Sequence, residues 1–370
     1  MKLRLTRAGT LGGPARRLIL SGLIAALAVT AVATATLAGA STSHTWTTSS
    51  TQSVSWRATA MDAPGSSTNT QLLGINDQGL ISGSYGSSSH GFTVSSPYTH
   101  TRDWHRMSFP GAVQTTVVAV SNNGTIIVGF FVTRTGATYG FTRWNGRWST
   151  VAYPKSMSSR HGMNQLLSVN DNGVATGFYR DSSGRSHGYL YNIRTRVFFI
   201  LVVPVRATTV VITAINNANV IVGFVVVGRV TVAFVIKNGV FHQLSFGRGT
   251  DTRAFGINSS GTVVGFFVNT SGVQQGFMWT STGMHVINSP WGTRGTVLTG
   301  VNNRGAVVGF FIDSRGRTRG FVVVFIIVQA TNYWWNWGGT GMTTPAPAGT
   351  GLPTGNLVNG GVSANSGHHW

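Results

Sequence analysis

All seven acidic side chains of this 370-residue chain are aspartates, and the chain has no glutamate and no cysteine. Asp77 and Asp171 follow the asparagine of an Asn-x-x-Gly sequence, and Asp181 and Asp313 each open an Asp-x-x-Gly sequence. Aspartate and asparagine hydrogen-bond the backbone two residues further on, and glycine adopts the positive φ that closes a tight turn. The sequence therefore predicts structural roles in turns for these four acids.

The other three acids, Asp62, Asp103 and Asp251, are predicted to lie in loops, and none has a recognisable partner in the sequence. A glycosidase usually needs two carboxylates that flank the scissile bond. No cysteine nucleophile exists, and no Gly-x-Ser-x-Gly or phosphate-loop motif stands between a strand and a helix. The sequence predicts no catalytic residues, and non-enzymatic function is favoured over an enzyme.

The histidines could bind a metal ion only if several of them converged. His90 and His187 occupy equivalent places before a Gly-aromatic pair, where other copies have Tyr139, Val232, Gln275 and Arg319. A zinc site needs three or four ligands. We expect no metal and no cofactor.

Loop aromatics and arginines are the candidates for ligand binding. Trp291 lies in the loop sequence SPWGTRG beside Arg294, where an indole could stack on a sugar ring or a base. Other loops predicted on the same face carry further candidates, namely Arg160, His161, Arg248 and Arg253. Trp104, Trp144, Trp148 and Trp279 are expected to pack between neighbouring units.

These residues are positioned by a repeat. Six copies of an apolar Asn-x-x-Gly element recur every 42 to 49 residues. They are GINDQGLISG at 74–83, AVSNNGTIIVG at 119–129, SVNDNGVATG at 168–177, AINNANVIVG at 214–223, GINSSGTVVG at 256–265 and GVNNRGAVVG at 300–309. A second polar turn, a Gly-aromatic pair and a third turn such as WNGRW at 144–148 follow in most copies. Three turns join four strands, and a four-stranded meander of this length has the size of a propeller blade.

The sequence predicts an all-β six-bladed propeller, with a β-solenoid as the alternative. The repeat cores fall near 70–110, 115–155, 164–205, 210–247, 252–290 and 296–328. Residues 53–61 resemble the last strand of a unit but precede the first copy, so we expect them to close the ring as the outermost strand of the last blade. The sequence NYWWNW at 332–337 competes for that place.

The combination of GINxxGxVVG with a following His-Gly-Phe or His-Gly-Tyr resembles the bacterial HAF-type extracellular repeat family over residues 70–328. The fourth unit departs most, with Asn219 where the turn glycine is expected and Ala233-Phe234 for the Gly-aromatic pair. The resemblance implies export and a repeat fold, and it implies no chemistry.

The two ends of the chain have separate compositions. Residues 1–40 combine basic residues, an apolar run and small residues, which predicts a signal peptide cleaved after Ala40, by the general or the twin-arginine route. A retained membrane anchor is the alternative there, and no transmembrane span is expected in the mature chain. Residues 329–370 are rich in glycine, threonine and proline and are predicted to be disordered.

Charge indicates the class of partner. Without the five basic residues of the predicted signal peptide, 22 Lys and Arg remain against 7 Asp, a net charge of +15. Such a surface attracts anionic polymers, although no basic run marks a specific nucleic-acid site. We therefore expect a secreted or cell-surface binding or adhesion module for a glycan or an anionic cell-wall polymer. The alternatives are a lyase or hydrolase acting at the channel mouth and a structural envelope protein.

Overall fold

The computed structural model describes residues 5–7, 45–47, 52–66, 69–98, 100–154, 162–244 and 251–329. The chain divides into Met1–Gln329 and Ala330–Trp370, and every described residue lies in the first part. The predicted cleavage after Ala40, the predicted tail beyond Gln329 and the competing strand at 332–337 fall outside the described residues.

The described part is all-β, with one short 3-10 turn, η2, at Thr101–Asp103. Among the described residues there is no helix that could span a bilayer.

Each repeat unit is a four-stranded antiparallel meander. Unit one holds β4 (Thr70–Ile75), β5 (Ile81–Tyr85), β6 (His90–Val94) and β7 (Trp104–Met107). Unit two holds β8 (Gln114–Val120), β9 (Ile126–Val132), β10 (Thr138–Trp144) and β11 (Arg147–Val151). Unit three holds β12 (Met163–Val169), β13 (Val174–Arg180), β14 (Ser186–Asn192) and β15 (Val197–Leu201).

The second half of the chain repeats the same plan. Unit four holds β16 (Thr209–Ile215), β17 (Ile221–Val227), β18 (Val230–Lys237) and β19 (Val240–Leu244). Unit five holds β20 (Thr252–Ile257), β21 (Val263–Val268), β22 (Gln274–Thr280) and β23 (Gly283–Val286). Unit six holds β24 (Gly295–Val301), β25 (Val307–Ile312) and β26 (Thr318–Gln329). The antiparallel pairing within each unit differs from the parallel rungs of a β-solenoid, the alternative fold.

The fourth strand of unit six comes from the other end of the sequence. Strand β3 (Gln52–Met61) lies antiparallel to β26, with Met61 opposite Gly320 and Gln52 opposite Gln329. This is the neighbour expected for residues 53–61, and β2 (Thr45–Thr47) pairs with the far edge of β3. Strand β1 (Leu5–Arg7), inside the predicted signal peptide, pairs with the edge strand β15.

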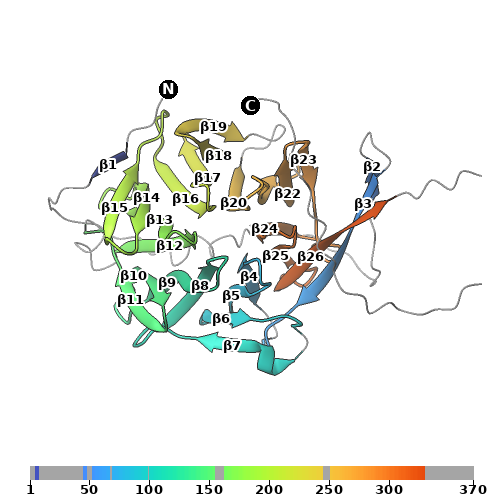
Figure 1. The fold of residues 1–370 in the computed structure, drawn as a ribbon, viewed down its shortest axis with the longest axis horizontal. Helices are drawn as coiled ribbons and strands as arrows, with labels where there is room; N and C mark the ends of the chain where they lie inside the picture. Colours follow the sequence, from blue (N-terminus) through green and yellow to red (C-terminus); the bar gives the residue numbers. More distant parts are fainter. Residues whose placement is uncertain are drawn as a thin grey trace, which may run out of the picture. The chain divides into compact units, whose positions relative to one another are not determined.

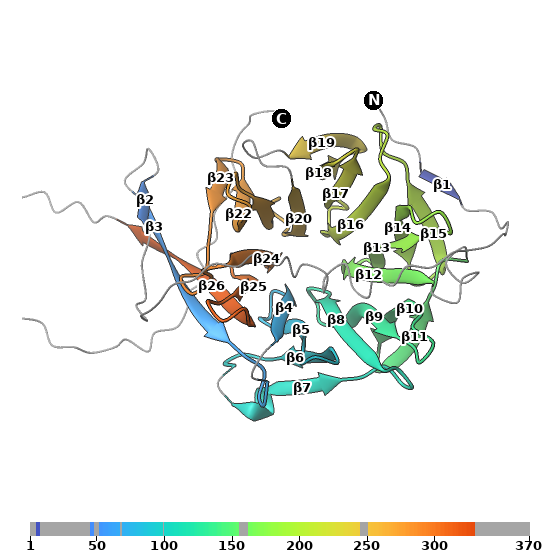
Figure 2. The same ribbon diagram turned by 180° about the vertical axis from the view of Figure 1, so that it is seen from behind.

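The six units follow one another around a common centre, with the first strand of each unit innermost (Figure 1), and the reverse view shows the same order (Figure 2). At several joints, the first residues of a third strand form a parallel bridge to the inner strand of the next unit, as Thr138 does to Met163. The same bridge joins Thr318 of unit six to Asn69, just before unit one. The arrangement is propeller-like.

A bulge in each inner strand explains the glycine that ends every copy of the repeat element, such as Gly265 in GINSSGTVVG. In unit five the register shifts between Ala254 and Gly256, opposite Gly265. A Cβ on Gly265 would lie 2.0 Å from the carbonyl oxygen of Arg253, and the equivalent glycines in the other units are equally close to backbone. The bulge thus places an inner-strand carbonyl where no side chain fits, so only glycine is accommodated.

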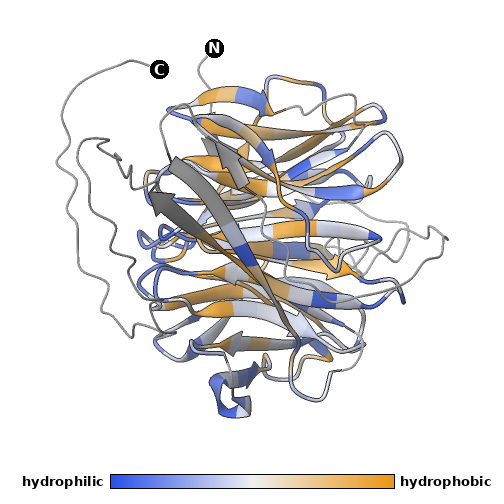
Figure 3. Ribbon diagram, turned by 90° about the vertical axis from the view of Figure 1, so that its right-hand side faces the viewer, coloured by the Kyte–Doolittle hydropathy of each residue, from blue (hydrophilic) through white to orange (hydrophobic). Residues whose placement is uncertain are grey.

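Apolar side chains fill both the centre and the joints between units. Figure 3 shows the apolar residues along the strands and the hydrophilic ones gathered toward the loops. The aromatic residue of each Gly-aromatic pair, and Phe234 of the Ala-Phe pair in unit four, is almost completely buried; these residues are Phe92, Phe141, Tyr189, Phe234, Phe277 and Phe321. The joint between unit six and unit one has its own cluster, in which Met61, Leu72 and Val308 meet. Burial, rather than disulfides, holds the described units together.

Candidate functional site

The predicted ligand-binding residues are not brought together. Trp291 is half-buried between units five and six, with its ring centroid 5.8 Å from that of Phe311. Arg294 is exposed in the same loop. Arg253 was expected in a loop but lies within the inner strand β20 and lines the centre of the structure, because the strand already begins at Thr252. The other predicted residues, Arg160, His161 and Arg248, lie outside the described residues.

The asparagines of the first turns form a belt around one end of the centre. In every unit except unit two, the asparagine Oδ1 accepts backbone N–H groups, while Nδ2 donates to the equivalent backbone carbonyl of the next unit. These inter-unit bonds join Asn76 to Ser121 (3.2 Å), Asn170 to Asn216 (3.2 Å), Asn216 to Asn258 (3.0 Å), Asn258 to Asn302 (3.1 Å) and Asn302 to Asn76 (3.1 Å).

Unit two interrupts the belt. Its turn is one residue longer, because the N–H of Ser121 donates to Ile126, five residues on, whereas that of Asn170 donates to Val174, four residues on. Ser121 has no side-chain amide, so it cannot donate the inter-unit hydrogen bond to unit three that asparagine makes in the other units. A second contact takes over at this joint, where the N–H of Asn123 donates to the carboxylate of Asp171 at 2.9 Å.

All seven aspartate side chains lie in the described part, and each is already engaged. Asp77 and Asp171 bridge neighbouring turns through Asn303 and Asn217. The others bind partners in their own loops or nearby strands: Asp62 pairs with Arg319, Asp103 accepts from the His100 N–H, Asp181 pairs with His187, Asp251 with Arg253 and Asp313 with Arg317. The structure thus supplies the partners that the sequence did not reveal for Asp62, Asp103 and Asp251.

The histidines bind locally. His187 Nε2 lies 2.7 Å from an oxygen of Asp181, and His90 Nδ1 lies 2.9 Å from a guanidinium nitrogen of Arg106. Burial and the nearby arginine lower the pKa of His90. In the described ranges, no three His or Asp side chains gather in a group that could hold a metal ion.

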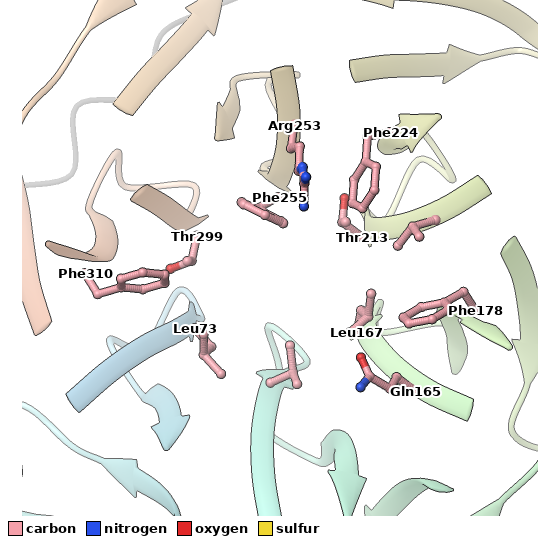
Figure 4. Close-up of a pocket in the computed structure, with 12 residues that line it drawn as sticks. Leu73, Gln165, Leu167, Phe178, Thr213, Phe224, Arg253, Phe255, Thr299 and Phe310 are labelled. Atoms are coloured by element: carbon pink, nitrogen blue, oxygen red, sulfur yellow. The ribbon is translucent and has the colours of Figure 1, made fainter. Parts of the chain in front are cut away.

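The centre of the structure is nearly filled. At the end away from the asparagine belt, a cavity of about 40 Å³ is walled by leucine, valine and phenylalanine side chains from all six units, with Gln165 and Arg253 among them (Figure 4). A polar cavity of about 70 Å³ lies within the belt. Ligand pockets usually measure about 300–1,000 Å³, so neither cavity admits a whole sugar ring.

A larger groove lies outside the centre, between the outer hairpins of units two and three. It encloses about 570 Å³. Strands β10 and β11 with the turn between them form one wall, and the end of β14 with the turn after it forms the other. Its lining residues are Thr142, Trp144, Asn145, Arg147, Ser149, Tyr191, Ile193, Arg194 and Arg196. The volume is that of a pocket for a ligand the size of a sugar.

Aromatic side chains and arginines dominate this groove. Tyr191 and Ile193 are buried, Trp144 is half-buried, and Arg147, Arg194 and Arg196 are exposed. The Arg194 guanidinium lies 5.7 Å from the centroid of the Trp144 ring, within the range of a cation–π contact. Burial raises the pKa of the Tyr191 hydroxyl, and the positive charge of Arg196 acts in the opposite direction. The groove's lining includes three arginines and no aspartate, and Asp171 lines the adjoining cavity that Trp144 and Arg194 share.

The backbone at Arg196 is held in an uncommon conformation. Its φ is +56°, in the left-handed region, which asparagine occupies in the corresponding turns at Asn145 and Asn238. A long side chain is disfavoured there relative to glycine or asparagine. An arginine at this position is therefore not explained by the needs of the turn.

The sequence contained a signal for this groove that the repeat alignment did not single out. The arginines stand in the turns NGR and NIRTR, between the third and fourth strands of units two and three. The matching turns of units four and five, KNGV and TSTG, carry none. Arginine in these turns is therefore not required by the four-stranded unit, because units four and five form the same connection without it.

No family model and no curated protein matches the chain. Solved structures similar to it include AofleA from Arthrobotrys oligospora, with a TM-score of 0.47 and 8% identity over 74% of this chain and 93% of that one. TolB from Acinetobacter baumannii has a TM-score of 0.41 and 11% identity over 69% of this chain and 63% of its own. A fucose-specific lectin from Aleuria aurantia has a TM-score of 0.36 and 11% identity, covering 66% of this chain and 92% of its own.

Proposed function

We propose that this chain is a closed six-bladed propeller that acts as a non-enzymatic binding module for an acidic glycan. The ligand binds in the groove between units two and three. The observation that carries the proposal is this groove of about 570 Å³, whose lining combines the half-buried Trp144 with three arginines and includes no carboxylate.

Contacts between the last and first units support the closed ring. The Thr299 hydroxyl of unit six donates to the carbonyl of Leu72 in unit one at 2.7 Å. Asn302 continues the asparagine belt to Asn76. A Cβ on Gly300 would lie 3.1 Å from the Cα of Gly74, so the two inner strands are in close contact. Unit six thus meets unit one through the same kinds of contact that join the other units.

The composition of the groove supports an acidic sugar. The half-buried indole ring of Trp144 offers apolar surface to the face of a sugar, and the hydroxyl of the exposed Ser149 offers a hydrogen bond. Guanidinium groups bind carboxylate, sulfate or phosphate through paired hydrogen bonds. The ligand class is therefore a saccharide with anionic substituents, such as a uronic acid unit of a cell-wall polymer.

The engagement of the carboxylates supports binding rather than catalysis. General acid or base chemistry needs a group free to exchange a proton with the substrate. Asp62, Asp251 and Asp313 are held in ion pairs with arginines, Asp181 is hydrogen-bonded to His187, and the other three accept backbone hydrogen bonds. None of the seven lines the groove.

The proposal includes export to the cell surface or medium. It rests on the signal-like sequence of residues 1–40 and on the resemblance to HAF-type repeats. An acidic cell-wall glycan is a ligand that an exported protein with a net charge of +15 would meet.

The test compares binding to polygalacturonate with binding to the neutral polymer dextran at two salt concentrations. Trp144→Ala should weaken binding to polygalacturonate at least about tenfold, and Arg194→Gln about fivefold, through loss of one stacking surface and one charge. Arg304→Gln is the matched control, because it removes an exposed charge from the asparagine-turn region of unit six. Thermal unfolding establishes that each variant is folded.

Each other outcome contradicts a part of the proposal. Equal losses in Arg194→Gln and Arg304→Gln, with no binding at high salt, would mean that net charge alone attracts the polymer. If Arg294→Gln lost binding to polygalacturonate while the groove variants kept it, the binding site would be the loop that contains Trp291. Equal affinity for dextran would contradict the acidic ligand class.

A further inference from the structure

Gln165 is the anomalous polar side chain of the central cavity. It lies on the inner strand β12 and is completely buried, and neither its Oε1 nor its Nε2 has a hydrogen-bond partner. Figure 4 shows its amide group turned toward the middle of the ring of inner strands. Burying an amide without a partner costs stability, so folding alone does not explain this glutamine.

The surroundings offer Gln165 no partner of its own. Leu73, Leu167 and Phe178 are among the apolar walls. The hydroxyl of Thr213 is occupied by carbonyl groups of its own and the next unit, as is that of Thr299. The remaining polar side chain of the lining, Arg253, points toward the same space (Figure 4).

Arg253 does not make the cavity cationic. Its Nε and one terminal nitrogen donate to both oxygens of Asp251 at 2.9 and 2.8 Å. The guanidinium also lies 4.9 Å from the ring centroid of Phe224. The pair is neutral as a whole, and a desolvated anion or cation would find no unpaired opposite charge in this lining.

We propose that this cavity binds a small neutral carboxamide group. A carboxamide has one N–H donor side and one carbonyl acceptor, which are the complements of the two free atoms of Gln165. Its carbon substituent packs against the leucine and phenylalanine walls. A volume of about 40 Å³ holds roughly three water-sized groups, close to the size of an acetamido group.

The acetamido group of an amino sugar and the side-chain amide of a peptide share this chemistry. The direct probe is acetamide, followed through the side-chain ¹⁵N–¹H signals of Gln165 in the full chain. These signals are assigned by their loss in Gln165→Leu. We expect a saturable shift at millimolar acetamide, with no such shift from acetone or acetate at equal concentration, since the first lacks a donor and the second carries a charge.

Substitutions supply the second readout. Gln71→Leu is the matched control, because Gln71 occupies the equivalent inner-strand position of unit one but does not line the cavity. Acetamide should raise the unfolding temperature of the native chain and of Gln71→Leu but not that of Gln165→Leu. Without ligand, Gln165→Leu should unfold at a temperature roughly 3 °C higher than the native chain, because two unsatisfied atoms are removed.

The sources are separated by two pairs of probes. N-acetylglucosamine against glucosamine tests the sugar, and Ala-Gln-Ala against Ala-Leu-Ala tests the peptide. A saturable response to the amide member of either pair supports the proposal and identifies the source. Unmoved Gln165 signals with acetamide, or equal acetamide binding by Gln165→Leu, would mean that the cavity holds only water and would overturn it.

Discussion

Replacing Asn302 by aspartate tests the belt that joins unit six to unit one. Asn302 is 4% exposed, its Oδ1 accepts the N–H groups of Arg304 and Ala306, and its Nδ2 donates to the carbonyl of Asn76 at 3.1 Å. Asn302→Asp keeps the shape and both accepted bonds. It removes only the donor to unit one and places a carboxylate oxygen against a carbonyl oxygen.

The expected loss follows from these contacts. A buried hydrogen bond contributes about 1 kcal/mol, and a partly desolvated carboxylate facing a carbonyl adds a penalty of similar size or larger. We expect Asn302→Asp to lower the free energy of unfolding by about 2–4 kcal/mol at pH 7. For a folded part of this size the unfolding temperature should fall by roughly 3–7 °C.

The sign of the pH dependence gives an independent check. The carboxylate of Asn302→Asp would have a folded-state pKa raised above the unfolded value of about 3.9. Its penalty is therefore absent below pH 4 and grows as the pH rises toward the raised pKa. Below pH 4 the protonated carboxyl can also donate to the carbonyl of Asn76, so variant and native chain should there unfold at similar temperatures.

Asn269→Asp is the matched control. Asn269 Oδ1 accepts two backbone N–H groups in the second turn of unit five, at 3.0 and 2.9 Å, and makes no bond to another unit. In units three and six the equivalent residue is already an aspartate, Asp181 and Asp313 respectively. This change should alter stability by less than about 0.5 kcal/mol. Equal unfolding temperatures for the two variants at pH 7 would refute the belt as the link between the last and first units.

Three further predictions concern the fold. Gly265→Ala should lower the free energy of unfolding by about 3 kcal/mol in a denaturant titration, because its Cβ would lie 2.0 Å from an inner-strand carbonyl. Deleting residues 41–62 should lower the unfolding temperature, because β26 loses its neighbour β3, whereas unchanged stability would show that this strand is dispensable. Burial acts to raise the pKa of Asp313, but hydrogen bonds from Arg317 and from the Arg315 N–H lower it overall. Its stabilisation is present above about pH 4 and is lost as the pH falls through the lowered pKa, so Asp313→Asn should give a shallower acid dependence of the unfolding temperature.

The repeat made most of the backbone predictable. Tight-turn residues such as Asn258 and Gly261 mark strand ends through local hydrogen bonds and positive φ, which depend on a few neighbouring residues. Because the same turn residues recur in six copies, they predict which strands follow one another within each unit. The same residues did not reveal that Asn258 also donates to unit six, since that bond depends on how two units pack.

The candidate site was much less predictable. Trp291 stood in a loop sequence beside an arginine, yet it is half-buried against Phe311. Arg194 and Trp144 are 50 residues apart in the sequence and come into contact only because the outer hairpins of units two and three face each other across the groove. An alignment of repeats compares equivalent positions, whereas this groove is formed by non-equivalent ones.

The sequence by itself determined the all-β class, the six four-stranded units and the engagement of Asp181 and Asp313 in turns, because these follow from turn chemistry and alternating apolar residues acting over short distances. Only the tertiary structure decided which side chains meet across the joints: the partner of Asp62, the groove around Trp144 and the unpartnered amide of Gln165. Contacts between units depend on the relative placement of strands about 40 or more residues apart, and that placement comes from the packing of bulged inner strands and buried aromatics around a common centre.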